Sequence, residues 1–251
     1  MNLEGLDASI LGPALAAGLL VVSTHVPLGR EVLSRGIIFI DLAIAQIAGL
    51  GVIAAHAVDW GGGGWSVQVT ALGAALGGAL VLYWCERQWP DVQEAIIGTA
   101  FIVAACTGIL LLSVNPHAGD YIQELMVGQI LWADYEQLLP IAGLYALVLL
   151  LWFTVVRSGQ RLAFYLLFAV TVTVSVQLVG VYLVFASLII PALAVRKAGP
   201  RGLWLAYGLS AAGYALGLIV SALFDLPAGA VIVLTLAVLA PLASTGAKVA
   251  G

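Results

Sequence analysis

Residues 35–51, RGIIFIDLAIAQIAGLG, decide the class of the fold. The segment is apolar almost throughout and is typical of a transmembrane helix, yet it contains the carboxylate of Asp41 and the amide of Gln46. A carboxylate near the centre of a bilayer costs about 2.5 to 3.5 kcal/mol on an insertion scale. The acid therefore needs either a structural or a functional explanation.

The whole chain has the same apolar character. Of its 251 residues, 63% are hydrophobic and 9% are charged, and the mean hydropathy is +1.11. Soluble domains carry about 25% charged residues, so this chain cannot cover a water-facing surface. We predict an integral membrane protein, and the net charge of −4 gives no indication of a nucleic-acid partner. The N-terminus lacks the basic region of a secretory signal, so we expect the first apolar run to be retained.

The apolar runs predict the number of helices, because a spanning helix needs about 20 apolar residues. A shorter run at 183–195 is a continuation of the run before it, a re-entrant segment or a short ninth crossing. We predict one transmembrane domain over residues 1–251, an all-α polytopic bundle of eight or nine helices. The eight long runs are 9–28, 36–57, 66–84, 94–113, 138–156, 162–182, 203–223 and 228–247.

The basic residues predict the orientation of the bundle. If the N-terminus is outside and 183–195 crosses the bilayer, all 9 Lys and Arg residues fall on one side. The positive-inside rule makes that side the cytoplasm. The opposite loops, HAVDWGGGGW, NPHAGDYIQE and FDLPAG, carry acids and histidines but neither Lys nor Arg.

The sequence lacks the motifs of a catalytic or ATP-binding domain. The run GGGG at 61–64 is not followed by Gly-Lys-Ser/Thr, and neither His-Glu-x-x-His nor Gly-x-Ser-x-Gly occurs. We therefore expect no enzymatic activity and no bound cofactor. The pairs Gly73 and Gly77, and Gly213 and Gly217, have the spacing that lets helix backbones approach closely.

Residues 175–196, SVQLVGVYLVFASLIIPALAVR, resemble the permeases of zinc, manganese and iron ABC importers. That family typically has Gln-x-Val-Gly-x-x-Leu-Val-x-x-x-Leu-Ile-x-Pro-Ala-x-x-Ala at this place. The matching residues are Gln177, Val179, Gly180, Leu183, Val184, Leu188, Ile189, Pro191, Ala192 and Ala194. Three further segments are similar to the family: PLGREVLSRGIIFIDLAIAQ, VQEAIIGTAFIVAACTGILLLS and GDYIQELMVGQILWADYEQLLP.

The resemblance implies a permease fold of the cobalamin-importer type in a bacterial cytoplasmic (inner) membrane. It further implies a homodimeric pore that works with two cytoplasmic ABC ATPase subunits, which bind the ATP, and with an external metal-binding protein. Zinc is the first expected cargo, with manganese and iron open. A secondary transporter driven by an ion gradient is the alternative, and inverted repeats would support it, but no convincing repeat is visible.

The chain departs from the family at two places. The family usually has Gly-Asp-x-x-x-His-Ala in its second helix, whereas here Asp41 is followed by Ala45, or by Gln46 under another alignment. The family also has an acidic helical insert, Glu-x-x-Ala-x-x-x-Gly, that docks on the ATPase. Here the link is only VRSGQR, residues 156–161.

Asp41, His25 and Gln46 are the candidate metal residues of the translocation path. Asp41 either handles a cation or is a packing acid paired with Arg35 or a backbone donor. His25 either replaces the missing histidine, at the same depth as Asp41, or hydrogen-bonds the first loop. Gln46 lies about 140° round a regular helix from Asp41.

A second candidate group lies in an outer loop. His117, Asp120 and Glu124 have side chains that bind zinc well. They form either a ligand set or a solvated acidic rim that attracts cations or docks a binding protein. His56 and Asp59 have the same two interpretations.

Overall fold

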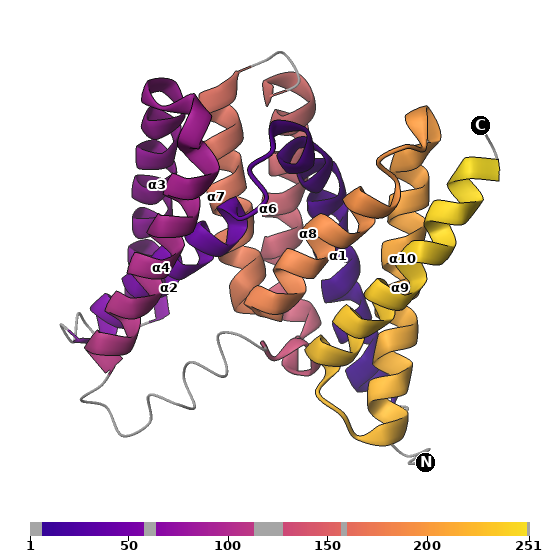
Figure 1. Ribbon diagram of the computed structural model, residues 1–251. Helices are drawn as coiled ribbons and strands as arrows, with labels where there is room; N and C mark the ends of the chain where they lie inside the picture. Colours follow the sequence, from indigo (N-terminus) through magenta and orange to yellow (C-terminus); the bar gives the residue numbers. More distant parts are fainter. Residues whose placement is uncertain (1–6, 58–63, 113–127, 157–159, 250–251) are drawn as a thin grey trace. The chain divides into compact units, whose positions relative to one another are not determined.

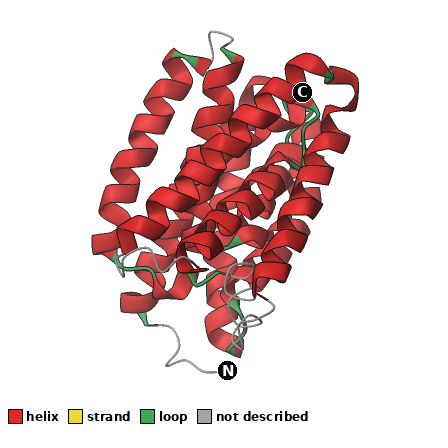
Figure 2. Cartoon of the chain, turned by 90° about the vertical axis from the view of Figure 1, so that its left-hand side faces the viewer, coloured by secondary structure: helices red, strands yellow, loops and turns green. Residues whose placement is uncertain are grey.

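The computed structural model describes residues 7–57, 64–112, 128–156 and 160–249, and within these ranges the regular elements are all helices (Figures 1 and 2). Three short 3-10 turns precede longer helices: η2 (Pro90–Val92), η3 (Ile130–Trp132) and η5 (Gly199–Arg201). The α-helices are α1 (Ala8–Arg35), α2 (Ile40–Ala57), α3 (Gly64–Gln88), α4 (Gln93–Leu112), α6 (Tyr135–Thr154), α7 (Arg161–Val179), α8 (Val181–Ala194), α9 (Gly202–Phe224) and α10 (Ala228–Val249).

Each of the nine predicted apolar runs forms a helix, which confirms the predicted all-α class. Within the described ranges, six helices are long and apolar enough to cross a membrane: α1, α3, α4 together with η2, α6, α7 and α9. The other three, α2, α8 and α10, contain shorter apolar stretches. The chain is therefore a polytopic helical membrane protein.

The chain divides into two compact units, and the division passes through α6 and α7. In unit 1, α8 packs on α1 and α10, and α9 packs on the same two helices. In unit 2, α2 packs on both α3 and α4. Unit 1 consists of Met1–Arg35, Met126–Leu147 and Ser175–Gly251, and unit 2 of Gly36–Leu125 and Val148–Val174.

The first helix is longer than predicted, because α1 continues past residue 28 to Arg35 with Pro13 and Pro27 inside it. Proline removes one backbone donor and usually kinks or ends a helix. Here tertiary packing outweighs that preference. At Gly29 the backbone of α1 lies so close to α8 that an added Cβ would be 1.9 Å from the carbonyl oxygen of Leu188. Because α1 ends at Arg35 and α2 begins at Ile40, residues 36–39 form the whole link between the two helices.

The run at 183–195 is a separate helix, α8, and not a continuation of α7. Gly180 separates the two helices with φ 82° and ψ 161°, a conformation open to glycine and strained for other residues. Gly128, at φ 70°, lies against the same break, where an added Cβ would be 2.2 Å from the carbonyl carbon of Val179. The 14 residues of α8 span about 21 Å at 1.5 Å per residue.

The two Gly-x-x-x-Gly pairs differ in their surroundings. An added Cβ at Gly213 would be 2.4 Å from the Leu236 side chain, and one at Gly217 would be 2.7 Å from the Cα of Ile232. This pair therefore sets the close packing of α9 on α10, as predicted. Gly73 and Gly77 have no such neighbour within 4 Å in the described part of the chain, so the prediction of close packing is wrong for them in this structure.

We expect Gly29→Ala to lower the stability of the purified protein, because the new methyl group meets a backbone atom that cannot move aside. Overpacking of this kind costs about 1 to 3 kcal/mol. Gly77→Ala is the matched control, since its methyl group enters open space and alanine favours helix. Thermal unfolding in detergent measures both variants. Equal unfolding temperatures for Gly29→Ala and the unmodified chain would contradict the close α1–α8 contact.

Candidate functional site

Asp41 is a buried carboxylate in the first turn of α2. It is 1% exposed, and neither of its oxygens has a hydrogen-bond partner among the described residues. The start of a helix favours a negative charge, which lowers but does not remove the cost of burying one. No other side chain among the described residues is thus bonded to this carboxylate, and the groups that act on it include the backbone N–H groups of Asp41 and Leu42.

The face of α2 that carries Asp41 offers no second ligand one turn further on. Ala45 stands there and is 1% exposed, so a methyl group fills the place at which the related permeases carry histidine. Gln46 is half-buried, and because α2 is an uninterrupted α-helix it lies about 140° round from Asp41. The predicted separation of these two faces is confirmed.

Glu94, in the first turn of α4, is a residue that the sequence analysis missed. Its Oε1 accepts a hydrogen bond from the backbone N–H of Phe39 at 3.3 Å, just before α2 begins. Its Oε2 is buried without a hydrogen-bond partner among the described residues, and its charge acts on Asp41 within the same unit. Glu94 therefore both fixes the start of α2 and adds a second carboxylate near Asp41.

His25 is fully buried in α1 and bonded within its own helix. Its Nδ1 lies 2.9 Å from the carbonyl oxygen of Val21 and 3.2 Å from Oγ1 of Thr24. A carbonyl oxygen only accepts, so Nδ1 of the neutral ring carries the proton and Nε2 presents a lone pair. Nε2 is buried with no hydrogen-bond partner in the described ranges. Metal-binding histidines are usually fixed through the other nitrogen in this way.

The alternative that His25 caps the first loop is wrong, because the ring bonds to Val21. The expected equal depth of His25 and Asp41 assumed that the first helix ends at 28. That assumption is also wrong: His25 lies ten residues before Arg35, at which α1 ends. His25 belongs to unit 1 and Asp41 to unit 2, so their pairing stays a prediction. Arg35, the other expected partner of Asp41, donates from Nε to Glu31 at 2.8 Å.

Several predicted residues fall where the structure gives no description. His117, Asp120, Glu124 and Asp59 lie outside the described residues, as do residues 157–159 of the link at 156–161. His56 belongs to α2, but its side chain is not among those described. Within the described ranges no three His, Cys, Asp or Glu side chains are grouped as a metal site, so any site there has few protein ligands.

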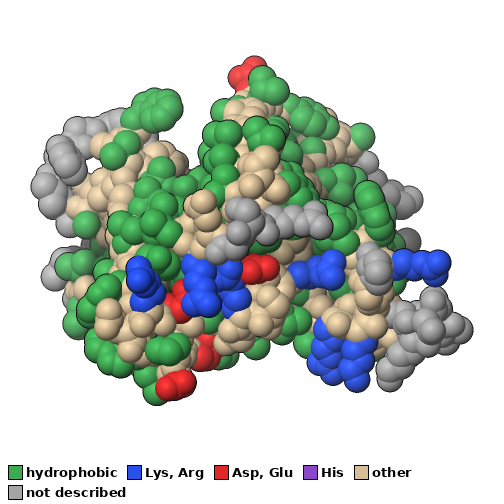
Figure 3. Space-filling view, turned by 90° about the horizontal axis from the view of Figure 1, so that it is seen from above, with side chains coloured by type: hydrophobic (Ala, Val, Ile, Leu, Met, Phe, Trp, Pro, Cys, Tyr) green, Lys and Arg blue, Asp and Glu red, His purple; other side chains and the backbone are tan. Residues whose placement is uncertain are grey.

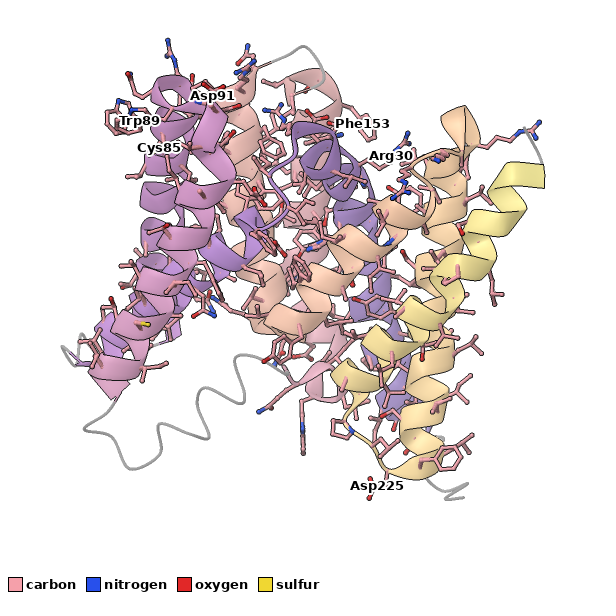
Figure 4. The ribbon with its side chains drawn as sticks, in the orientation of Figure 1. Arg30, Cys85, Trp89, Asp91, Phe153 and Asp225 are labelled. Carbon is pink, nitrogen blue, oxygen red and sulfur yellow. The ribbon has the colours of Figure 1, made fainter. Side chains whose placement is uncertain are left out.

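Buried hydroxyl groups join the helices of unit 1. The hydroxyls of Ser187 in α8 and Tyr214 in α9 are 2.8 Å apart, and Tyr145 in α6 bonds to Ser175 in α7. Tyr207 donates to the backbone carbonyl of Ser23 at 2.9 Å. In Figure 4, Arg30 lies at the upper end of unit 1 and Asp225 at its lower end. These two residues thus lie at opposite ends of the unit, which agrees with the predicted orientation, and the orientation itself stays a prediction.

The chain is similar to known proteins in both sequence and fold. A 172-residue alignment with the uncharacterised membrane protein slr2045 of Synechocystis sp. is 26% identical and covers 67% of this chain. The chain spans 58% of that relative's length.

Two solved structures have a similar fold. One is PsaBC from Streptococcus pneumoniae in complex with Fab, with a TM-score of 0.75, 22% identity and coverage of 97% of this chain and 95% of that one. The other is described as a metal-chelate type ABC transporter in an inward-facing conformation, with a TM-score of 0.65, 17% identity and coverage of 93% and 85%.

The model of the ABC 3 transport family matches residues 7–159 and 159–246, nearly the whole length. This match confirms the resemblance inferred from residues 175–196 and from the three further segments that are similar to the family. The chain belongs to the ABC 3 transport family.

Proposed function

We propose that this chain is the membrane-spanning permease subunit of an ATP-driven importer of a divalent transition-metal ion. Zinc is the first cargo to test, with manganese and iron next. Two copies form the pore in a bacterial cytoplasmic membrane, two ATPase subunits bind on the cytoplasmic side, and an external binding protein delivers the metal. The family match supports a transport role, and the description of one similar structure as a metal-chelate type ABC transporter favours a metal cargo.

The observation that carries the metal cargo is the buried, unpartnered carboxylate of Asp41. Ionisable residues kept inside a membrane usually face a transport path or a water-filled cavity. Carboxylate oxygen binds zinc as well as harder cations such as manganese, whereas imidazole nitrogen favours zinc. Because Ala45 replaces the usual imidazole of α2, His25 is the histidine that would favour zinc. A site with few ligands is weak, which suits an ion that must leave again.

The division of labour follows from what the sequence lacks. Without a Gly-Lys-Ser/Thr loop the chain has no phosphate-binding loop of the usual type, so we assign ATP hydrolysis to a separate subunit. We place the docking contact of that subunit in part on the short link VRSGQR, which provides less surface than the insert of related permeases. Gln46 also lines the path, from a different face of α2 than Asp41. His117, Asp120 and Glu124 form an outer rim that attracts cations.

We expect Asp41→Asn to reduce uptake of radioactive zinc to background in cells that carry the complete transporter. The substitution keeps the shape of the side chain and removes its charge. His25→Ala should reduce uptake by about 10- to 100-fold, the range typical of losing a partner at a metal site. Asp225→Asn is the matched control, because Asp225 lies at an exposed helix end and should leave uptake unchanged. Normal uptake in Asp41→Asn, at unchanged protein level and ATPase co-purification, would contradict the proposal.

A second pair of variants separates the two roles of Glu94. Glu94→Gln keeps an acceptor for the N–H of Phe39, whereas Glu94→Ala removes both the acceptor and the charge. If Glu94 chiefly positions the start of α2, the Gln variant should retain zinc uptake and the Ala variant should lose most of it. Equal loss in both variants would instead assign the role to the charge near Asp41.

A further inference from the structure

A groove of about 480 Å³ lies between α8 and α10 in unit 1, apart from the residues assigned to transport. Its walls are apolar: Leu193 and Ala194 come from α8, and Ala237, Ala240 and Pro241 come from α10. The small side chains on both helices leave the space between them unfilled. The two helices pack against each other, so the groove is a property of one unit.

One end of the groove is positively charged. Arg196 and Lys197 follow the C-terminal end of α8 and line the groove there. Both side chains are exposed, and neither makes an ion pair within the described residues. Figure 3 views the molecule from the end at which Figure 4 labels Arg30, and it shows Lys and Arg side chains on that face.

Among the described residues of unit 1, no free carboxylate is found beside this pair. Between Glu136 and Asp225 the sequence contains no Asp or Glu, and none follows Asp225. Asp225 lies at the opposite end of unit 1 from Arg30 (Figure 4). Glu31 in α1 is engaged by Arg35 at 2.8 Å. Arg196 and Lys197 are therefore available to an anionic group of another molecule.

We propose that this groove binds an anionic phospholipid. Its phosphate lies between Arg196 and Lys197, and one acyl chain follows the apolar wall formed by Leu193, Ala237 and Ala240. A guanidinium group can donate two parallel hydrogen bonds to the oxygens of one phosphate. Basic pockets between membrane helices bind anionic headgroups. The occupant must be apolar along most of its length and negative at one end. A phospholipid has both properties, whereas free phosphate has only the charge.

Native mass spectrometry of the purified full-length chain tests the proposal with defined lipids. We expect phosphatidylglycerol to remain bound under conditions that remove phosphatidylcholine with the same acyl chains. Each cation near a membrane surface contributes roughly a factor of five in binding, so Arg196→Gln with Lys197→Gln should weaken phosphatidylglycerol binding about thirtyfold. Arg201→Gln is the matched control, since Arg201 lies in the same turn region but does not line the groove.

A third variant tests the apolar wall separately. Ala240→Phe fills the groove and leaves both cations in place, so it should also release the lipid, with thermal unfolding confirming that the variant is folded. Equal retention of the two lipids would overturn the proposal. So would displacement of phosphatidylglycerol by millimolar inorganic phosphate, which would indicate a site for free anions. Unchanged lipid binding in the charge variant, with loss of ATPase co-purification, would reassign the two cations to a protein interface.

Discussion

The close contact of α1 with α8 and α9 is the constraint on which the arrangement of unit 1 depends. At Gly29 the backbone of α1 lies against the carbonyl of Leu188, and at Gly18 it lies against the ring of Tyr214. His25 falls between these two glycines on the same face of the helix, because steps of seven and four residues return to nearly the same angle. The close packing of α1 on α8 and α9 also buries the imidazole of His25. The ring is hydrogen-bonded within its own helix, to the carbonyl oxygen of Val21.

The same physical reasoning connects the polar groups of both units with transport. Packing helices in a membrane requires small side chains and satisfied hydroxyl groups, and the Ser187–Tyr214 and Tyr145–Ser175 pairs meet that requirement. Asp41 and Nε2 of His25 do not, because both are buried without a partner among the described residues. Groups of this kind weaken the fold unless a ligand or water satisfies them. Their retention is the physical basis for our proposal that both lie on the path of a cation.

Local pattern predicted most of the helices but few of the contacts. Apolar runs of about 20 residues identify helices directly, and each predicted run forms one. The first predicted run ends at residue 28, so the end of α1 was missed, and there Gly29 lies against Leu188, which is distant in the sequence. The conformation of Gly180, which separates α7 from α8, depends on the approach of Gly128. Glu94 was missed because its partner Phe39 is 55 residues away. The burial of Asp41 could be predicted from its place in an apolar run. Its lack of a hydrogen-bond partner among the described residues could be seen only in the structure.

We propose that this chain forms a metal pathway that is driven by ATP on another subunit. Proteoliposomes provide the most direct measurement: the purified chain is reconstituted alone, or with its ATPase and external binding protein, and the accumulation of radioactive zinc is followed. We expect accumulation only in the complete assembly with ATP enclosed on the ATPase side, and none with Asp41→Asn. Zinc accumulation by the chain alone under a proton or sodium gradient would contradict it and would identify a secondary transporter.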